Sequence, residues 1–113
     1  MSARVLLLAA VSGVLLVAAG CGGDGEAAAP VATTEVTMPK SYRFDPDRIA
    51  VEPGATVTFR NEDNLTHTVK VDGGADHKVS PGESVSITFG DPGTHHYVCT
   101  LQPHDMDGEV IVG

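Results

Sequence analysis

Residues 84–89 read Ser-Val-Ser-Ile-Thr-Phe, so apolar side chains alternate with hydroxyl-bearing ones along the whole run. A period of two is the pattern of a strand that lays one face on a core. Residues 55–60 read Ala-Thr-Val-Thr-Phe-Arg and repeat the pattern, which predicts that Val57 and Phe59 face the same side. The two runs therefore predict two strands that cover one hydrophobic core.

Outward from these runs, the chain from residue 35 onward contains further short β-type runs and no long amphipathic helix. The further runs cover residues 35–38, 48–51, 67–71, 94–99 and 109–112. Gly, Pro, Asp and Ser stand between them and mark turns. About seven short strands in one small domain predict an antiparallel β-sandwich or barrel.

The first 20 residues have a different character. Arg4 supplies a positive charge, residues 5–19 are uncharged and mostly apolar, and small residues precede Cys21. That order is typical of a secretory signal peptide, and about 15 apolar residues fall short of the roughly 20 that span a bilayer. Cys21 is placed as in the bacterial lipobox, although Ala18 stands where that motif prefers leucine. We expect residues 1–20 to be a lipoprotein signal peptide and Cys21 to be lipidated, with simple secretion or an uncleaved anchor as the alternatives.

Residues 21–34 are rich in small and polar side chains and show no hydrophobic period. This composition predicts a flexible tether. We expect residues 35–113 to form the one folded domain. A domain of that size buries a limited core, so it gains stability from a crosslink or a metal ion.

A disulfide is not expected to supply that stability, because the chain has only two cysteines and Cys21 is assigned to the lipid. Cys99 is then a lone thiol in an oxidising compartment, where it is open to oxidation or crosslinking. Two explanations remain open from the cysteine alone: Cys99 is a metal ligand, or it is a buried and inert side chain.

The charge of the chain is −8 at pH 7, with 15 acidic and 7 basic residues. Nucleic acid is therefore not an expected partner, because phosphate binding needs basic clusters. An acidic surface favours basic partners and keeps the protein in solution. The sequence also shows no nucleophile elbow, no phosphate-binding glycine loop and no paired carboxylates, so no enzyme is predicted.

The loop between the last two predicted strands concentrates metal-binding side chains. Cys99, His104 and Met106 lie within eight residues, and His67 stands at the start of a distant strand. Two imidazoles, one thiolate and a weak axial thioether form the trigonal site of blue-copper proteins. Thiolate and thioether suit Cu(I), whereas imidazole accepts both Cu(I) and Cu(II). Such a site changes little on electron transfer, and the metal itself keeps the thiol deprotonated.

The chain resembles the cupredoxins of the plastocyanin and amicyanin type. Five segments that span almost the whole domain carry this resemblance: residues 44–51, 54–63, 66–69, 92–99 and 108–112. The resemblance implies a Greek-key β-sandwich of seven to eight strands with one copper ion at one end. It further implies a type 1 copper electron-transfer protein that cycles between Cu(II) and Cu(I), with His67 and Cys99 as two of the ligands.

The loop departs from the family pattern at one position. Amicyanin-like loops place the second histidine three residues after the cysteine, and Gln102 stands there in this chain. Our hypothesis takes His104 as the second imidazole ligand and Met106 as the axial one, because imidazole binds copper better than an amide. The alternatives are that Gln102 binds through its amide oxygen, or that the site is degenerate and binds metal weakly.

Other histidines and methionines are predicted to have structural places. We expect His95 to pack at or near the core, His96 and His77 to lie at the surface, and Met38 to belong to the core. The expected partner is a redox protein, which can itself be bound to the membrane. The chain is expected to be a monomer that its lipid anchor holds close to such a partner. The expected location is the periplasmic or extracellular face of the cytoplasmic membrane. A copper carrier or chaperone without redox turnover and a metal-free interaction domain are the competing functions.

Overall fold

The computed structural model describes residues 29–103 and 105–113, and all regular structure in them is β-strand. The nine strands of this part of the chain are β1 (Val31–Ala32), β2 (Glu35–Met38), β3 (Arg48–Val51), β4 (Ala55–Asn61), β5 (His67–Val71), β6 (Asp76–Val79), β7 (Ser84–Phe89), β8 (Gly93–Val98) and β9 (Asp107–Val112). The alternating runs at residues 55–60 and 84–89 are β4 and β7, which confirms both as strands.

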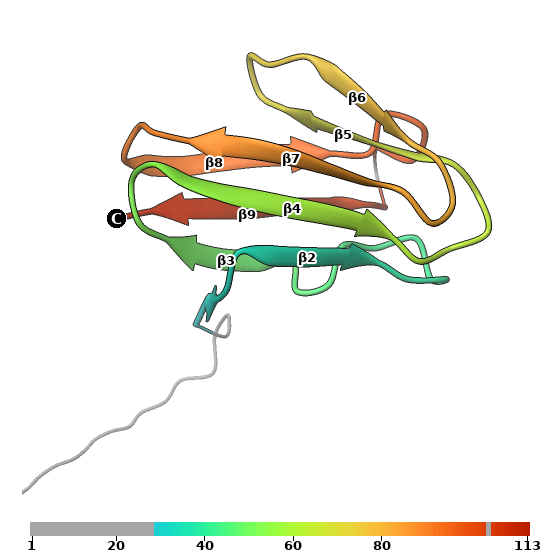
Figure 1. Ribbon diagram of the computed structural model, residues 1–113, viewed down its shortest axis with the longest axis horizontal. Coiled ribbons are helices and arrows are strands. Elements are labelled where there is room, and N and C mark those ends of the chain that lie inside the picture. The colour runs from blue at the N-terminus through green and yellow to red at the C-terminus, as the bar shows by residue number, and fades with distance from the viewer. Residues whose placement is uncertain (1–28, 104) are drawn as a thin grey trace, which may run out of the picture.

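The strands form two sheets that pack as a sandwich (Figure 1). One sheet has the order β1-β3-β9-β8-β5-β6 and the other the order β2-β4-β7. In the small sheet Val57 pairs with Ile87 and Phe59 with Val85, so the apolar faces of the two alternating runs coincide. The predicted β-sandwich is therefore confirmed.

Three strand pairs depart from the antiparallel pairing that the sequence predicted. β1 with β3, β2 with β4, and β3 with β9 are parallel pairs. The reason is the path of the chain, which passes from β2 to β3 in the other sheet and returns to β4. Two reversals restore the original direction, and local side-chain alternation carries no information about such crossings.

The core lies between the sheets and includes the buried aromatic rings of Phe44, Phe59, Phe89 and Tyr97. Phe44 and Phe59 meet the ring of Tyr97 edge-on, with centroids 4.7 and 5.1 Å apart. Met38 is fully buried, as predicted. On β7, Val85 and Ile87 are only half-buried, because β7 is an edge strand of the small sheet.

Two strands were not predicted. β6 contains only one apolar residue, Val79, and exists because its backbone pairs with β5 at the edge of the large sheet. β1 pairs with β3 and lies in the stretch predicted to be tether, so ordered structure begins before Glu35. The predicted signal peptide, Cys21 and the first part of the tether lie outside the described residues. Within residues 29–103 and 105–113, no helix is long and apolar enough to cross a bilayer.

Candidate metal centre

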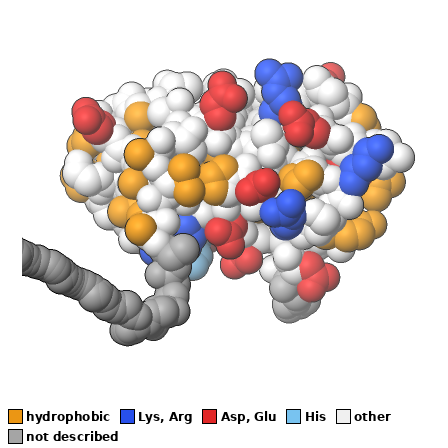
Figure 2. All heavy atoms as spheres, turned by 90° about the horizontal axis from the view of Figure 1, so that it is seen from below, with side chains coloured by type: hydrophobic (Ala, Val, Ile, Leu, Met, Phe, Trp, Pro, Cys, Tyr) orange, Lys and Arg blue, Asp and Glu red, His pale blue; other side chains and the backbone are white. Residues whose placement is uncertain are grey.

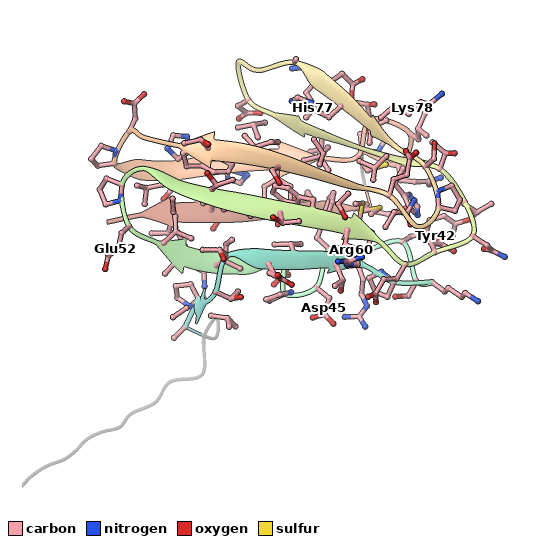
Figure 3. The ribbon with its side chains drawn as sticks, in the orientation of Figure 1. Tyr42, Asp45, Glu52, Arg60, His77 and Lys78 are labelled. Atoms are coloured by element: carbon pink, nitrogen blue, oxygen red, sulfur yellow. The ribbon has the colours of Figure 1, made fainter. Side chains whose placement is uncertain are left out.

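The candidate site lies at the end of the sandwich where β4 and β8 finish and β5 and β9 begin, opposite the C-terminus (Figure 1). Tyr42 lies at this end and Glu52 at the far end (Figure 3). Two loops meet here: residues 62–66 lead into β5, and residues 99–106 lead into β9. Side chains that are distant in the sequence are thereby brought together.

The first loop is shaped by Asn61, the last residue of β4, which is completely buried. Its amide nitrogen donates to the carbonyl oxygens of Leu65 (2.8 Å) and Val79 (3.0 Å). Its amide oxygen accepts from the backbone nitrogen of Asp63 (2.8 Å). One side chain thus ties the loop to itself and to β6, and this fixes the entry into β5.

His67 opens β5 with its side chain only 1% exposed. Its Nε2 lies 2.8 Å from Oδ2 of Asp63, and its Nδ1 lies 3.8 Å from Sγ of Cys99. An ionised carboxylate can only accept a hydrogen bond, so Nε2 carries the proton. In the neutral ring Nδ1 then presents a lone pair toward the sulfur of Cys99, as a metal ligand must.

The carboxylate of Asp63 is held in place from both sides. Its Oδ1 accepts from the backbone nitrogen of Asn64 (2.7 Å), and Oδ2 is engaged by His67. The hydrogen bond from His67 is the main reason why the pKa of Asp63 lies below its usual value of 3.8, and it outweighs the opposing effect of burial. Asp63 is therefore charged at neutral pH.

Cys99 follows β8 directly and is fully buried. Its Sγ lies 3.4 Å from the backbone nitrogen of Thr68, which donates to it. Burial raises the pKa of the Cys99 thiol, but hydrogen bonds to the sulfur, above all from the Thr68 amide, outweigh it, so the pKa lies below its usual value of 9.0. The site favours a thiolate, which is the form that binds metals.

A hydroxyl pair joins the two loops beside the sulfur. The backbone nitrogen of Thr100 donates to Oγ1 of Thr68 (2.7 Å), and the two hydroxyl oxygens lie 2.8 Å apart. The Thr100 hydroxyl also donates to Asp76 on β6 (3.0 Å). These bonds hold the neighbours of His67 and Cys99 in register.

The second loop folds back so that Met106 returns to Cys99. The backbone nitrogen of Gln102 donates to the backbone carbonyl of Cys99 (3.0 Å), and the backbone carbonyl of Gln102 accepts from the backbone nitrogens of Asp105 and Met106. The backbone nitrogen of Cys99 donates to the carbonyl of Met106 (3.0 Å). The Met106 side chain is fully buried, and Gln102 is half-buried.

The other expected ligand, His104, lies outside the described residues. The choice between His104 and Gln102 therefore stays a prediction. In the part of the chain that the structure describes, no group of three or more His, Cys, Asp or Glu side chains is placed to hold a metal ion. A site built on His67 and Cys99 thus needs the Met106 thioether and a further ligand from the 99–106 loop.

The remaining histidines occupy other places. His95 packs edge-on against Phe89, with centroids 5.5 Å apart, and its Nε2 lies 2.8 Å from the carbonyl oxygen of Asp91. His96 is exposed and its Nε2 lies 3.0 Å from Glu109. His77 lies on the edge strand β6 (Figure 3) and is half-buried, less exposed than expected.

Sequence reasoning did not assign a role to two neighbours of His67. Asp63 was noticed only as part of a motif, and the signal that points to it is a carboxylate four residues before the candidate ligand. Tyr42 meets the His67 ring edge-on at 6.2 Å. Its approach depends on the 39–47 loop, whose path no periodic pattern predicts.

Comparison with known proteins places this arrangement among relatives. A family model described as a cupredoxin-like domain matches residues 7–112. The chain is 33% identical over 112 residues to amicyanin-alpha of Methylorubrum extorquens, covering 93% of this chain and 92% of that protein. It is 34% identical over 128 residues to chloroplastic plastocyanin of Physcomitrium patens, covering 94% of this chain and 67% of that protein.

Solved structures give the same result for the fold. An oxidised amicyanin variant superposes with a TM-score of 0.64 at 26% identity, covering 74% of this chain and 86% of that chain. A purple cupredoxin from Nitrosopumilus maritimus superposes with a TM-score of 0.65, covering 72% of this chain and all of that one. At 20% identity this second likeness concerns the fold alone.

Proposed function

Because this chain belongs to the cupredoxin-like family, we propose that it is a type 1 (blue) copper electron-transfer protein with one copper ion as its cofactor. The observation that carries the proposal is the 3.8 Å approach of the His67 Nδ1 to the Cys99 Sγ inside a buried site. His67, Cys99 and Met106 are three of the proposed ligands, and His104 is the fourth.

The donor set fits copper in both of its oxidation states. Thiolate and thioether sulfur favour Cu(I), and imidazole nitrogen is suitable for Cu(I) and Cu(II). When bound, the copper ion supplies a one-electron couple. The protein contributes an enclosure that excludes solvent, because His67, Cys99 and Met106 are at most 1% exposed.

The protein itself holds two of the proposed ligands, His67 and Cys99, in place. Asn61 shapes the loop before His67, and the Thr68 amide holds the sulfur of Cys99. A site that is preorganised in this way needs little rearrangement when its charge changes, which favours electron transfer over catalysis. No catalytic role is proposed.

The proposed location follows from the N-terminal segment. A lipidated Cys21 and the residues that follow it would hold the domain at the outer face of the cytoplasmic membrane. Tethering raises the effective concentration of the domain against a membrane-bound redox partner. We propose a monomer that exchanges electrons with such a partner protein.

The test is a visible absorption spectrum after one equivalent of Cu(II) is added to the purified domain. An intense thiolate-to-copper band is expected, and His104→Ala is expected to remove or shift it. Gln102→Ala should leave the band in place, and His96→Ala serves as the matched control because that histidine is exposed and paired with Glu109. Loss of the band in the Gln102 variant alone would overturn the choice of His104.

A copper carrier without redox turnover is the second candidate, and the unusual place of the loop histidine favours it. Stopped-flow electron exchange and copper transfer to a metal-free acceptor separate the two functions. Rapid electron exchange with retained copper supports the electron carrier. Slow exchange together with efficient copper transfer supports the copper carrier.

A further inference from the structure

The contact between Asp63 and His67 carries an inference that rests on the proposed copper site and goes beyond it. We infer that Asp63 is a positioning residue: its carboxylate holds His67 with the proton on Nε2, strengthens Nδ1 as a copper ligand and thereby lowers the reduction potential of the bound copper. A carboxylate that accepts from a ligand histidine orients the ring and raises its basicity in other metal sites.

The geometry makes the contact a built feature. The side chain of Asp63 is 5% exposed and that of His67 is 1% exposed, and the joining distance is 2.8 Å. Asn61 fixes the backbone of Asp63, and Asn64 occupies its second carboxylate oxygen. The carboxylate therefore cannot turn away from the ring without breaking buried hydrogen bonds.

The negative charge of Asp63 acts mainly on His67. Within residues 29–103 and 105–113, His67 is the one side chain within ion-pair distance of this carboxylate, and Lys40 acts on it only from a longer range. A buried negative charge is weakly screened. Its effect therefore passes through the imidazole ring to whatever cation Nδ1 binds.

The direction of the effect follows from charge. A doubly charged cation gains more than a singly charged one from a stronger nitrogen donor and from a nearby carboxylate. Asp63 thus stabilises Cu(II) more than Cu(I), and the reduction potential falls. Removing the charge should raise the potential without removing a copper ligand.

The first arm of the test compares reduction potentials in the full copper-loaded chain. Asp63→Asn keeps the size and an acceptor oxygen but loses the charge. We expect the ratio of the Cu(II) to the Cu(I) binding constant to fall about tenfold, which raises a one-electron potential by about 59 mV. The matched control is Glu62→Gln, which removes the charge of an exposed neighbour on the same loop and should shift the potential far less.

The second arm does not depend on copper. Nitrogen-15 NMR of the metal-free wild-type protein should show the His67 ring protonated at Nε2, and Asp63→Ala should allow both tautomers. If Asp63→Ala fails to fold, the tautomer in the wild type and in Asp63→Asn still decides the matter. A proton on Nδ1 in the wild type would overturn the inference.

The two arms separate this inference from the proposed function. A blue band with equal potentials in Asp63→Asn and Glu62→Gln would refute the role of Asp63 and leave the copper protein standing. Absence of the band in a folded wild type would refute the copper protein, and the NMR result would still judge the pairing of Asp63 with His67.

Discussion

At the scale of single residues, Asn61 shapes the site although it is not a proposed copper ligand. Its side chain makes two hydrogen bonds as donor and one as acceptor, and the bonds to Val79 and Asp63 are buried. Each buried hydrogen bond contributes about 1 kcal/mol, and an unpaired buried group costs more. The conformation of the loop before His67 therefore depends on one amide.

Asn61→Ala is expected to lower the free energy of unfolding of the metal-free protein by about 2–4 kcal/mol, because three backbone groups lose their hydrogen bonds, two of them buried. Urea denaturation measures the change. Asn64→Ala, on the exposed part of the same loop, is the control and should cost much less. Equal values for the two variants would mean that the Asn61 bonds do not stabilise the loop.

Unlike the Asn61 side chain, the hydroxyl of Tyr97 is buried without a hydrogen-bond partner among the described residues. Burial raises the pKa of Tyr97 above its usual value, and the charges of Asp47 and Asp107 add to the shift. Because the folded-state pKa of Tyr97 is raised, ionisation of this tyrosine does not affect the free energy of unfolding below the unfolded-state pKa of about 10. Above that value, the free energy of unfolding falls as the pH rises.

Tyr97→Phe is therefore expected to raise the free energy of unfolding at neutral pH by about 1 kcal/mol, since the ring contacts with Phe44 and Phe59 remain. It should also reduce the loss of stability above about pH 10. Chemical denaturation at several pH values measures both effects, with Tyr42→Phe at the exposed Tyr42 as control. A marked loss of stability at neutral pH would show that the hydroxyl has a partner after all.

Part of the site was predictable residue by residue. The spacing of Cys99 and Met106 and the position of His67 pointed to one site, and the structure brings His67 and Cys99 together. The role of Asp63 was not predicted, because its spacing of four residues from His67 becomes a contact only through the turn that Asn61 imposes on the loop. The identity of the fourth ligand is still a prediction, since no spacing rule decides between Gln102 and His104.

At the scale of elements, β8 and β9 meet at a position that admits only glycine. Gly108 pairs with Tyr97 across the two strands. A Cβ atom at residue 108 would overlap the ring and hydroxyl of Tyr97 and the carbonyl oxygen of Asp47. The missing side chain makes room for the largest core residue, next to the loop that carries Met106.

Gly108→Ala is expected to destabilise the protein by about 1–3 kcal/mol, because neither the buried ring nor the backbone of Asp47 can move aside freely. Thermal unfolding of the metal-free protein detects the loss. Gly90→Ala is the matched control, because an added Cβ there meets nothing within 4 Å. Similar melting temperatures for the two variants would contradict the packing described for β8 and β9.

The strands differ in how well the sequence predicts them. β3, β5 and β7 begin and end where the pattern places them, because each alternates or concentrates β-branched side chains. β1 and β6 do not, because each forms by pairing at a sheet edge. Strand direction was also beyond local patterns, since the crossings between sheets decide it.

At the scale of the whole molecule, the net charge follows directly from the sequence. The chain carries −8, and acidic side chains lie scattered among basic and apolar ones on the face shown in Figure 2. A net negative field attracts cations and repels anions over distances comparable with the Debye length. The copper protein should therefore react at different rates with small redox partners of positive and of negative charge.

A small cationic oxidant is expected to react faster with the reduced copper protein than an anionic oxidant of similar potential. The difference should shrink as salt is raised from about 0.01 to 1 M, because the screening length falls from about 30 to 3 Å. Stopped-flow absorbance measures both rates. Rates that do not depend on the charge of the oxidant would mean that the net negative charge does not steer partners to the copper site.

The proposed function requires that the Cys99 sulfur and the His67 imidazole, which lie far apart in the sequence, bind one copper ion. Copper X-ray absorption fine structure on the loaded wild type and on His67→Ala tests it most directly. The claim predicts one short copper–sulfur distance and two nitrogen neighbours in the wild type, with one nitrogen lost in the variant. A shell without short sulfur, or one that His67→Ala leaves unchanged, would contradict it.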